Sequence, residues 1–587
     1  MVVTGVSRHE QTLGSAAASV YVITAEDIRR SGAATLPEAL RLAPNLLVAR
    51  ADVNSYAISA GGFNGTLANR MLVMIDGRIV YSPLYSGVFW EVQDVMLQDV
   101  ERIEVISGPG SSLWSPNAVN GVINIITRSA KDTPGTLVDV GGGDQMRQAA
   151  ARYGGRISKD AYYRVYAKTQ HFNHGETADG SPVADASERT QGGFRVDWGN
   201  PDNGTTVQGD LYTNTIDQAI GGARDLAGGN LIARRSRLYA DGASWRLQTY
   251  YDHVERSQPG AIWENLDTID LDFQYGLAPF RGHGLMWGAA YRHSRDWLVN
   301  LDPSALAFLP PSRSLDNYHV FLRDEWQLRP ELALTLGAKA EHNDYTGTEW
   351  LPTVRLAWNF APDHLLWTAI SRTVRAPSRI DREFYLPGTP PYLLQGGGSF
   401  VSEVAEVFQL GYRAQPMARL SYSATLYYYS NDRLRSFGGP GSTFSNQFQG
   451  NVYGLETWGS YRLTSNWRMD AGWLELRENL HPTPGASADV IEAVRGNDPH
   501  RQFMLRSFMD IGDFDVDVMA RYVAELPSPR VPAYAAVDAR LGWQAREDLQ
   551  LSLLIRNLFD PSHPEWDAGA GREEFPRTVF LEAEWGT

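Results

Sequence analysis

The chain has 587 residues, 43% of them hydrophobic and 11% aromatic, with no cysteine and a net charge of -15, which excludes a general nucleic-acid binder because such a protein carries a basic face. Mean hydropathy is -0.32, and no apolar run approaches the roughly 18 residues of a spanning helix, so a helical membrane protein is excluded as well. A membrane-spanning β-barrel stays possible, because lipid-facing and lumen-facing residues alternate along its strands and cancel in the average.

The first 130 residues predict a compact mixed domain that begins with a strand at residues 19–23. Two helices follow, each predicted by a hydroxyl and, three positions later, a carboxylate that together satisfy free amides at a helix start. These pairs are Thr24 with Asp27 and Thr35 with Glu38, and the second helix is expected to run through Leu42. Three further apolar runs rich in β-branched residues predict strands buried on both faces: residues 71–75, 100–106 and 119–127.

From about residue 131 the sequence consists of recurring segments in which apolar and polar residues alternate, as expected for strands with one lipid-facing and one lumen-facing side. Arg164, Lys168 and Arg521 lie on the polar side of such segments. The clearest apolar stripes are Tyr163, Val165, Ala167 and Thr169; Leu420, Tyr422, Ala424, Leu426 and Tyr428; and Phe514, Val516, Val518, Ala520 and Tyr522.

The connections between these segments are of two kinds, short turns and long polar loops, as an outer-membrane barrel requires. At about 21 residues for a strand with its connection, residues 131–587 hold roughly 22 strands, a size associated with a plugged lumen, although roughly 18 or 20 strands also fit. Short turns are predicted at residues 329–331, 361–363, 415–417, 464–466 and 546–548. Long loops are predicted at residues 171–191, 298–317, 375–402 and 476–501.

The sequence carries no strong catalytic or metal-binding motif. His171 and His174 lie three positions apart with Glu176 nearby, which is a possible metal pair, but the spacing fixes no third ligand. We therefore expect no catalytic residue, no metal ligand and no cofactor.

Several segments in order resemble the TonB-dependent outer-membrane receptors. The most specific is Val100-Glu101-Arg102-Ile103-Glu104-Val105-Ile106-Ser107-Gly108-Pro109, continued by Asn120-Gly121-Val122-Ile123-Asn124 and Ile125-Ile126-Thr127. Residues 20–28, 37–46 and 71–78 are similar to the start of the plug domain of this family, and weaker barrel matches lie at 371–378, 408–412, 453–456, 557–560 and 577–585. The resemblance implies a transmembrane β-barrel of about 22 antiparallel strands, residues 131–587, with an N-terminal α+β plug domain, residues 1–130, inside the lumen.

The resemblance also implies a function and partners. A receptor of this kind is an active transporter in the bacterial outer membrane, surrounded by its lipids, and is driven by TonB with the inner-membrane ExbB and ExbD motor. The expected ligand is a ferric siderophore, with cobalamin, haem, another metal chelate or an oligosaccharide as alternatives, and we expect a monomer. A passive porin, a surface adhesin and a soluble multi-domain enzyme are alternatives from other classes.

The beginning of the chain bears on export and on energy coupling. Met1 is followed directly by Val2, Val3 and Thr4, so we expect that a signal peptide is missing from this chain. These three residues resemble the tail of the segment that engages TonB, and we expect them to contact TonB. The start of that segment is absent, which leaves open whether the chain as given can transport.

Candidate ligand-binding residues lie on two plug loops and one barrel loop. Exposed aromatic side chains suit pockets for organic molecules, and guanidinium groups suit anions. The alternatives are that Phe63 and Phe89 pack against the barrel wall, and that the loop arginines pair with Asp381 and Glu383. The candidates are Tyr56, Phe63 and Asn64 in loop 52–66; Tyr81, Tyr85, Phe89 and Trp90 in loop 81–91; and Arg375 and Arg379.

Three departures from the family pattern concern the junction of plug and barrel. Gly61, Ser107 and Gln409 stand where relatives carry Arg, Arg and Glu, groups thought to form a buried charge cluster. Removing one sign alone would leave an unpaired buried charge, so we expect neutral contacts here and another partner for Glu456. A misalignment of one of the three positions is the alternative. The chain also ends Trp585-Gly586-Thr587, where an aromatic end is typical, so an extension or a cloning remnant is expected.

Overall fold

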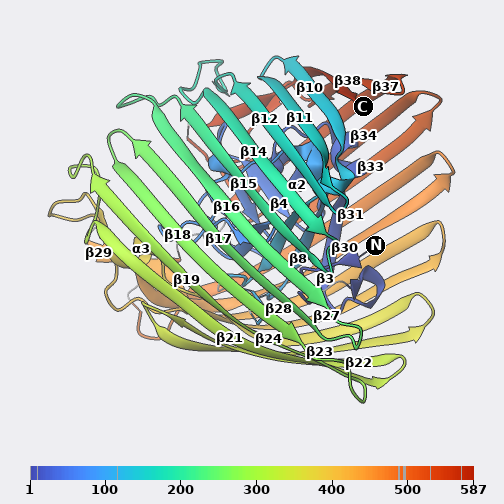
Figure 1. The fold of residues 1–587 in the computed structure, drawn as a ribbon. Helices are drawn as coiled ribbons and strands as arrows, with labels where there is room; N and C mark the ends of the chain where they lie inside the picture. The colour runs from blue at the N-terminus through green and yellow to red at the C-terminus, as the bar shows by residue number, and fades with distance from the viewer. Residues whose placement is uncertain are drawn as a thin grey trace.

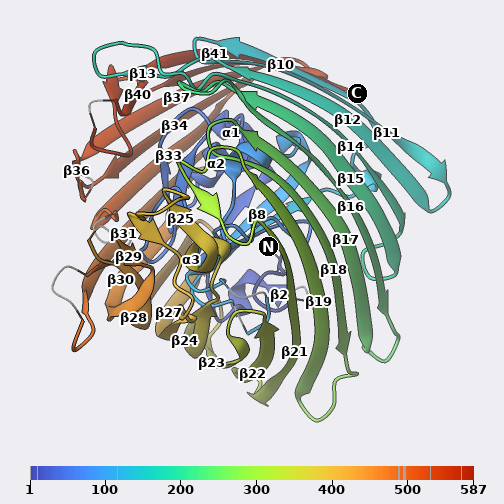
Figure 2. The same ribbon diagram turned by 90° about the vertical axis from the view of Figure 1, so that its left-hand side faces the viewer.

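The computed structural model describes residues 2–8, 11–110, 112–114, 117–439, 441–486, 490–492, 497–528, 530–569 and 571–587. In this part of the chain a closed barrel surrounds a small α/β domain, drawn in blue inside the ring of strands in Figure 1. A second view shows the same domain within the ring, with the short α3 at the loop-bearing end (Figure 2). The predicted architecture of an antiparallel barrel around an α+β plug is therefore confirmed.

The plug is built on a five-stranded sheet in the order β3-β8-β9-β6-β7. The capping box of Thr24 and Asp27 starts the first helix as predicted, and Thr35 caps the second, which ends at Leu40 instead of Leu42. The elements are β1 (Val2–Val3), β2 (Gln11–Thr12), β3 (Ser19–Thr24), α1 (Ala25–Ser31), α2 (Leu36–Leu40), β4 (Leu47–Arg50), β5 (Tyr56–Ser59), β6 (Met71–Ile75), β7 (Arg78–Ile79), β8 (Val100–Ser107) and β9 (Gly121–Thr127), with 3-10 turns at Leu13–Ser15, Trp90–Val92, Leu97–Asp99 and Ala130–Asp132.

A tight turn after β6 brings the sheet edge close to the barrel wall. Asp76 and Gly77 both have positive φ, 50° and 82°, as a two-residue hairpin turn demands, and a side chain at position 77 would meet the amide of Gln248 at 2.8 Å. The Asp76 carboxylate accepts from the backbone and hydroxyl of Thr127 and from Gln208. The turn is thus tied to both the plug sheet and the barrel.

The barrel closes between β10 and β41 and contains 22 long strands within the described residues, with the two-residue β32 (Ile491–Glu492) inserted between β31 and β33. These strands are β10 (Gly135–Gly143), β11 (Met146–Ser158), β12 (Ala161–Phe172), β14 (Ser187–Gly199), β15 (Gly204–Ile216), β16 (Arg224–Leu238), β17 (Ser244–Gln258), β18 (Ile262–Gly276), β19 (His283–Asn300), β21 (Ser312–Arg329), β22 (Leu332–Asn343), β23 (Gly347–Ala361), β24 (His364–Arg375), β27 (Glu403–Met417), β28 (Leu420–Phe437), β30 (Ser445–Thr464), β31 (Trp467–Pro482), β33 (Arg501–Ile511), β34 (Phe514–Val523), β37 (Tyr534–Arg546), β38 (Leu549–Arg556) and β41 (Thr578–Gly586). The predicted domain boundary at residue 130 falls between β9 and β10.

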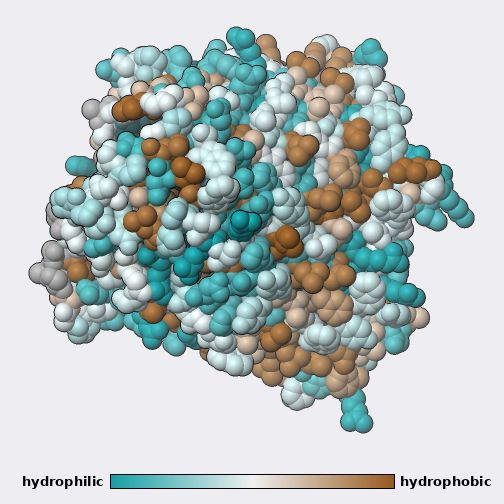
Figure 3. Space-filling view, turned by 60° about the vertical axis from the view of Figure 1, so that its left-hand side comes forward, coloured by the Kyte–Doolittle hydropathy of each residue, from teal (hydrophilic) through white to brown (hydrophobic). Residues whose placement is uncertain are grey.

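Alternation along the strands separates a lipid face from a lumen face. Val165, Leu426 and Val518 are exposed on the outer wall, whereas Arg164 and Lys168 are buried inside against the plug. Figure 3 shows hydrophobic side chains gathered over the wall of the barrel. None of the described helices is both long and apolar enough to cross a bilayer.

Long loops leave one end of the barrel and short turns leave the other, as predicted. The turn expected at 415–417 is wrong, because β27 continues to Met417 and the turn is at residues 418–419. Pro416 is tolerated there since the ladder to β28 is irregular between Ala414 and Met417. The loops carry α3 (Arg379–Glu383), β13 (Glu176–Thr177), β20 (Ala307–Phe308), β25 (Phe384–Leu386), β26 (Leu394–Gln395), β29 (Ser442–Thr443), β35 (Leu526–Pro527), β36 (Arg530–Val531), β39 (Ser562–His563) and β40 (Glu573–Pro576).

Neutral contacts occupy the junction where the family pattern places charges. The Gln409 amide donates to the Ser107 carbonyl at 3.3 Å, and the Asn45 amide donates to the Ser107 hydroxyl at 2.8 Å. Glu456 is buried and accepts from the Ser19 hydroxyl at 2.8 Å. These contacts agree with the expected neutral replacement and give Glu456 the Ser19 hydroxyl as a partner, while the replacement of a family charge cluster stays a prediction.

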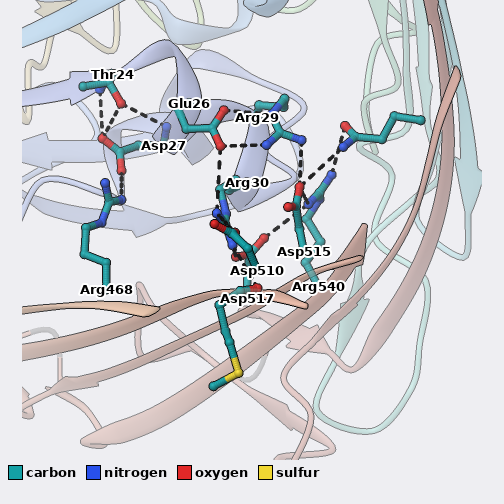
Figure 4. A network of polar contacts seen from close by, with 12 residues as sticks. Thr24, Glu26, Asp27, Arg29, Arg30, Arg468, Asp510, Asp515, Asp517 and Arg540 are labelled. Carbon is teal, nitrogen blue, oxygen red and sulfur yellow. Dashed lines mark hydrogen bonds and ion pairs between the residues drawn. The ribbon is translucent and has the colours of Figure 1, made fainter. Parts of the chain in front are cut away.

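Charged contacts instead hold the helix α1 against the barrel, as Figure 4 shows. The Arg30 guanidinium contacts Asp510 at 2.6 Å and Asp517 at 2.7 Å and is buried. Arg29, one residue earlier, pairs with Asp515 at 2.9 Å but is about one-third exposed. The same turn of helix therefore offers a buried and an exposed ion pair to the same barrel strands.

We expect Arg30→Met to destabilise the docking of α1 by about 2 kcal/mol, because it removes the charged hydrogen bonds of Arg30 to Asp517 and Asp510, while Arg540 still pairs with Asp517. Arg29→Met is the matched control and should cost less than about 1 kcal/mol, since solvent screens the exposed pair. Hydrogen–deuterium exchange of the α1 amides measures both. Equal exchange in the two variants would contradict this assignment.

Candidate functional site

The N-terminal segment lies against the plug inside the barrel. Thr4 and Gly5 donate backbone amides to the Glu104 carboxylate at 3.0 and 2.7 Å, and the Trp114 indole donates to the Gly5 carbonyl at 2.7 Å. Val3 is buried and pairs with β2, while Val2 is partly exposed. In this arrangement two of the three residues predicted to contact TonB, Val3 and Thr4, are held by the plug.

The first candidate loop, residues 52–66, is folded against the barrel. Phe63 has a positive φ of 61° and is buried beside barrel side chains such as Tyr427. The centre of its ring lies 3.7 Å from the guanidinium carbon of Arg70. Asn64 is fully buried, and its backbone amide donates to Asp498 at 3.1 Å. Tyr56 is buried and donates its hydroxyl to Glu38 at 3.0 Å.

The second candidate loop, residues 81–91, is mostly buried, with Tyr81 and Phe89 partly exposed. The Tyr85 ring is 1% exposed and contacts the Phe89 ring at a centroid distance of 4.8 Å. Phe89 lies 3.7 Å from the guanidinium of the barrel residue Arg256, and Tyr81 lies 5.3 Å from that of Arg292. Trp90 belongs to the plug core. Phe63 and Phe89 thus pack against the barrel wall, which was the alternative to a ligand contact.

The two candidate arginines are buried, and each pairs with one carboxylate of helix α3 and one of a barrel strand. Arg375 contacts Asp381 at 2.7 Å and Glu403 at 2.9 Å. Arg379 contacts Glu383 at 2.7 Å and Asp296 at 2.8 Å. The self-pairing alternative describes both side chains, and ligand contact by either stays a prediction.

The structure brings together a set of residues that the sequence did not single out as a site. A solvent-connected cavity lies between helix α2 of the plug and the barrel strands β11, β12, β34, β37, β38 and β41, near the loop-bearing end. Tyr56 is the one predicted candidate that lines it. The other aromatic and charged lining residues are Phe172, Phe575, Phe580, Arg41, Arg50, Arg521, Arg556, Glu38, Asp538 and Glu565. We call this cavity the α2 recess.

Ion pairs across the α2 recess fix its charged groups. Arg41 contacts Glu565 at 2.7 Å and Glu38 at 3.2 Å, and Arg556 contacts Glu38 at 2.8 Å. Burial alone would raise the pKa of Glu38, but the guanidinium groups of Arg41 and Arg556 overcome it and lower that pKa to about 2. Arg521 contacts Glu565 at 3.1 Å, while its Nε and Nη1 find no hydrogen-bond partner among the residues that the structure describes.

The recess could not be assembled from the sequence because its residues come from the plug and from several distant barrel strands. For one residue of the recess, Arg521, the sequence did give a signal, because the alternation of apolar and polar residues places it on the lumen side of its strand. No spacing rule relates position 41 to position 521 or 565, since closure of the barrel makes them neighbours. The possible metal pair at His171 and His174 gains no support, and no group of three or more metal-ligating side chains occurs among the described residues.

We expect Glu38→Gln to destabilise helix α2 by about 3 kcal/mol at neutral pH, which corresponds to roughly 100-fold faster amide exchange in α2. The folded pKa of Glu38 lies below its unfolded value of 4.5, so the stability it contributes is present above pH 4.5 and is lost as the pH falls toward 2. The ratio of exchange rates between variant and wild type should therefore shrink over this window. A ratio that does not change with pH would contradict the assignment.

Two family models match the chain. The model of the TonB dependent receptor-like β-barrel matches residues 127–558, and the model of the TonB-dependent receptor plug domain matches residues 12–122.

Named relatives extend this result. The chain is 30% identical over 608 aligned residues to the vitamin B12 transporter BtuB of Vibrio cholerae serotype O1, covering 99% of this chain and 94% of the relative. It is 26% identical to the iron-regulated outer membrane virulence protein of the same organism, a match that covers 64% of this chain and 60% of the relative, less than two thirds of its length.

Solved structures share the fold. The siderophore receptor PirA from Pseudomonas aeruginosa has a TM-score of 0.76 at 18% identity, covering 98% of this chain and all of that one. The copper transporter OprC has a TM-score of 0.79 at 15% identity, covering 97% and 98%. With a matching barrel, a matching plug and a full-length relative, the chain belongs to the TonB-dependent receptors.

Proposed function

We propose that the chain is an outer-membrane active transporter that imports a metal chelate, first of all a ferric siderophore, with energy supplied through TonB and its ExbB and ExbD motor. The observation that carries the proposal is the folded plug inside the barrel, with the segment Val2 to Thr4 attached to the plug sheet through Glu104. An open pore would need no such plug. The protein would act as a monomer among outer-membrane lipids and catalyse no reaction.

The α2 recess supports an anionic organic ligand. Its charged lining comprises four arginines, Arg41, Arg50, Arg521 and Arg556, and three carboxylates, so the positive charges are in excess. Arg521 has donors left without partners, and guanidinium groups bind carboxylate and similar planar anions well. The surrounding aromatic rings give the apolar surface that organic ligands need.

Cobalamin is the second candidate. The relative of full length and 30% identity is named a vitamin B12 transporter, whereas the siderophore and copper proteins are similar at 18% identity or less. An excess of arginines in the recess favours an anion over a ligand without net negative charge. Haem, another chelate and an oligosaccharide remain alternatives, as do a passive porin and an adhesin, both of which would work without TonB.

Uptake in cells tests the function. A strain that lacks the receptor should regain uptake of one labelled ligand, out of a panel of ferric siderophores, cobalamin and haem, when the full-length receptor is supplied. This uptake should fall to background in the same strain without TonB, because the outer membrane has no energy source of its own. Uptake that persists without TonB would replace the proposal with a passive pore.

Arg521→Ala should weaken binding of an anionic ligand by about tenfold or more, since a hydrogen bond to a charged group is worth about 1.5–3 kcal/mol. Glu565 keeps Arg41 as its partner, so the recess should stay folded. Arg572→Ala is the matched control, because this loop arginine pairs with Glu574 and does not line the recess. Equal affinity in the wild type and in Arg521→Ala, measured by titration with the ligand found above, would place the ligand elsewhere.

A further inference from the structure

Two arrays of polar side chains with the same composition lie on the outer wall of the barrel. In each array a tyrosine hydroxyl and the Nδ1 of a histidine contact the same carboxylate oxygen. These distances are 2.5 and 2.9 Å at Asp267, and 2.7 and 2.8 Å at Asp316. The arrays, which we call the wall arrays, are Tyr251, His253 and Asp267 on β17 and β18, and Tyr291, His293 and Asp316 on β19 and β21.

Alternation puts the wall arrays on the lipid side of their strands. Tyr251 and Tyr291 are exposed, whereas their chain neighbours Tyr250 and Arg292 are buried, with Arg292 against the plug residue Tyr81. The arrays lie in the loop-bearing halves of the strands, and exposed apolar side chains follow toward the short-turn end. These include Leu247, Ile269, Leu271, Val320 and Leu322. A charge on the lipid side is costly at the middle of a bilayer and cheap near its surface, so the wall arrays lie at the level of the lipid headgroups.

Hydrogen bonding within the wall arrays leaves one ring nitrogen of each histidine for a further partner. Because Nδ1 faces a carboxylate, it carries the proton in the neutral ring, and Nε2 is then an acceptor. The side chains of His253 and His293 are 33% and 38% exposed, so a molecule at the wall can reach them. An acceptor held in a fixed orientation suits a hydroxyl group, such as those of a sugar.

A cation and an aromatic ring stand beside these acceptors. Arg295 is exposed and lies opposite Asp267 in the ladder, and that carboxylate already accepts from the first array. The guanidinium can therefore bind an anionic group of another molecule. Trp297, on the same face, is exposed and packs edge-on against Trp263 at a centroid distance of 5.9 Å. Its indole offers a flat apolar surface on which a sugar ring can lie.

We propose that the wall arrays, together with Arg295 and Trp297, form a binding site for the headgroup of a glycolipid that carries phosphorylated sugars. Sugar hydroxyls donate to Nε2 of the two histidines, and a phosphate accepts from Arg295. The acyl chains lie along Ile269 and Leu271, which are exposed on β18 between the two arrays. A lipid-anchored partner fits because the site continues into the lipid-facing wall, whereas a free sugar phosphate makes no use of that apolar surface. The site is separate from the α2 recess, and the proposal does not depend on import.

Titration of the purified receptor with a glycolipid, followed by native mass spectrometry, tests the site. The probe is lipid A with its core sugars, and the comparison lipid is phosphatidylglycerol, which is anionic but carries no sugar. Arg295→Gln should weaken binding of the glycolipid by about tenfold, since a hydrogen bond to a charged group is lost. Arg235→Gln is the matched control and should leave the affinity unchanged, because Arg235 is exposed on the lipid side near the short-turn end, where it donates to Thr205.

Removal of the phosphates from the glycolipid separates the two kinds of contact. The dephosphorylated lipid should bind the wild type about tenfold more weakly, and Arg295→Gln should then have no further effect because the group it contacts is gone. His293→Phe should weaken binding of both forms by about threefold, since it removes the Nε2 acceptor. This variant leaves Asp316 with the Tyr291 hydroxyl as its partner.

Other outcomes overturn the proposal. Equal affinity of the wild type and Arg295→Gln for the phosphorylated glycolipid would remove the site. An equal loss of phosphatidylglycerol binding in this variant would show a general attraction of anionic lipids without recognition of a sugar. Competition by free glucosamine phosphate would assign the site to a soluble sugar. Affinity for phosphatidylglycerol, which should be the same in every variant, also shows that the wall remains folded.

Discussion

Backbone hydrogen bonding in lipid is the constraint from which the rest of this structure follows. A strand in a bilayer has no water to satisfy its amides and carbonyls, so the sheet must close, here through β10 and β41. Closure with 22 strands leaves a wide lumen, and a second folded unit has to fill it. Because the strands alternate, the inner wall is polar, and the plug that fits it must satisfy charges as well as fill space.

The plug meets this demand through ion pairs spread around its rim, with neutral contacts at the junction near Ser107. Arg30, Arg41 and Arg78 of the plug each pair with a carboxylate on a different part of the barrel wall. At Asp99 the charges are reversed, because the plug carries the carboxylate and the barrel carries the cation, Arg152. A buried charge that lost its partner would be costly, so these pairs define one seated position of the plug. The plug is therefore held by several separate ion pairs at its edges and by hydrogen bonds such as that of Gln409 to Ser107.

Local features could be predicted from the sequence, and features created by closure could not. Thr24 with Asp27 specifies a helix start within four residues, and alternation specifies which side of a strand faces lipid, so both predictions hold. Pro416 predicts a turn because proline breaks a ladder, yet an irregular strand end accommodates it. The partners that the aromatic loops find were not predictable: Phe63 packs against Arg70 and Phe89 packs against Arg256, while contact of these loops with a ligand stays a prediction. These partners are far away in sequence, and no local pattern pairs them.

The order of the plug sheet determines how a pull on the N-terminal segment would propagate. β3 is an edge strand that pairs only with β8, and the segment before it is held by side chains and a two-stranded pairing. Force applied there would first break the contacts of Thr4 and Gly5 with Glu104 and would then reach β3. The parallel pair β6 and β9 lies on the other side of β8 and loses no hydrogen bond when β3 leaves. The sheet can therefore lose β3 while its other four strands stay paired.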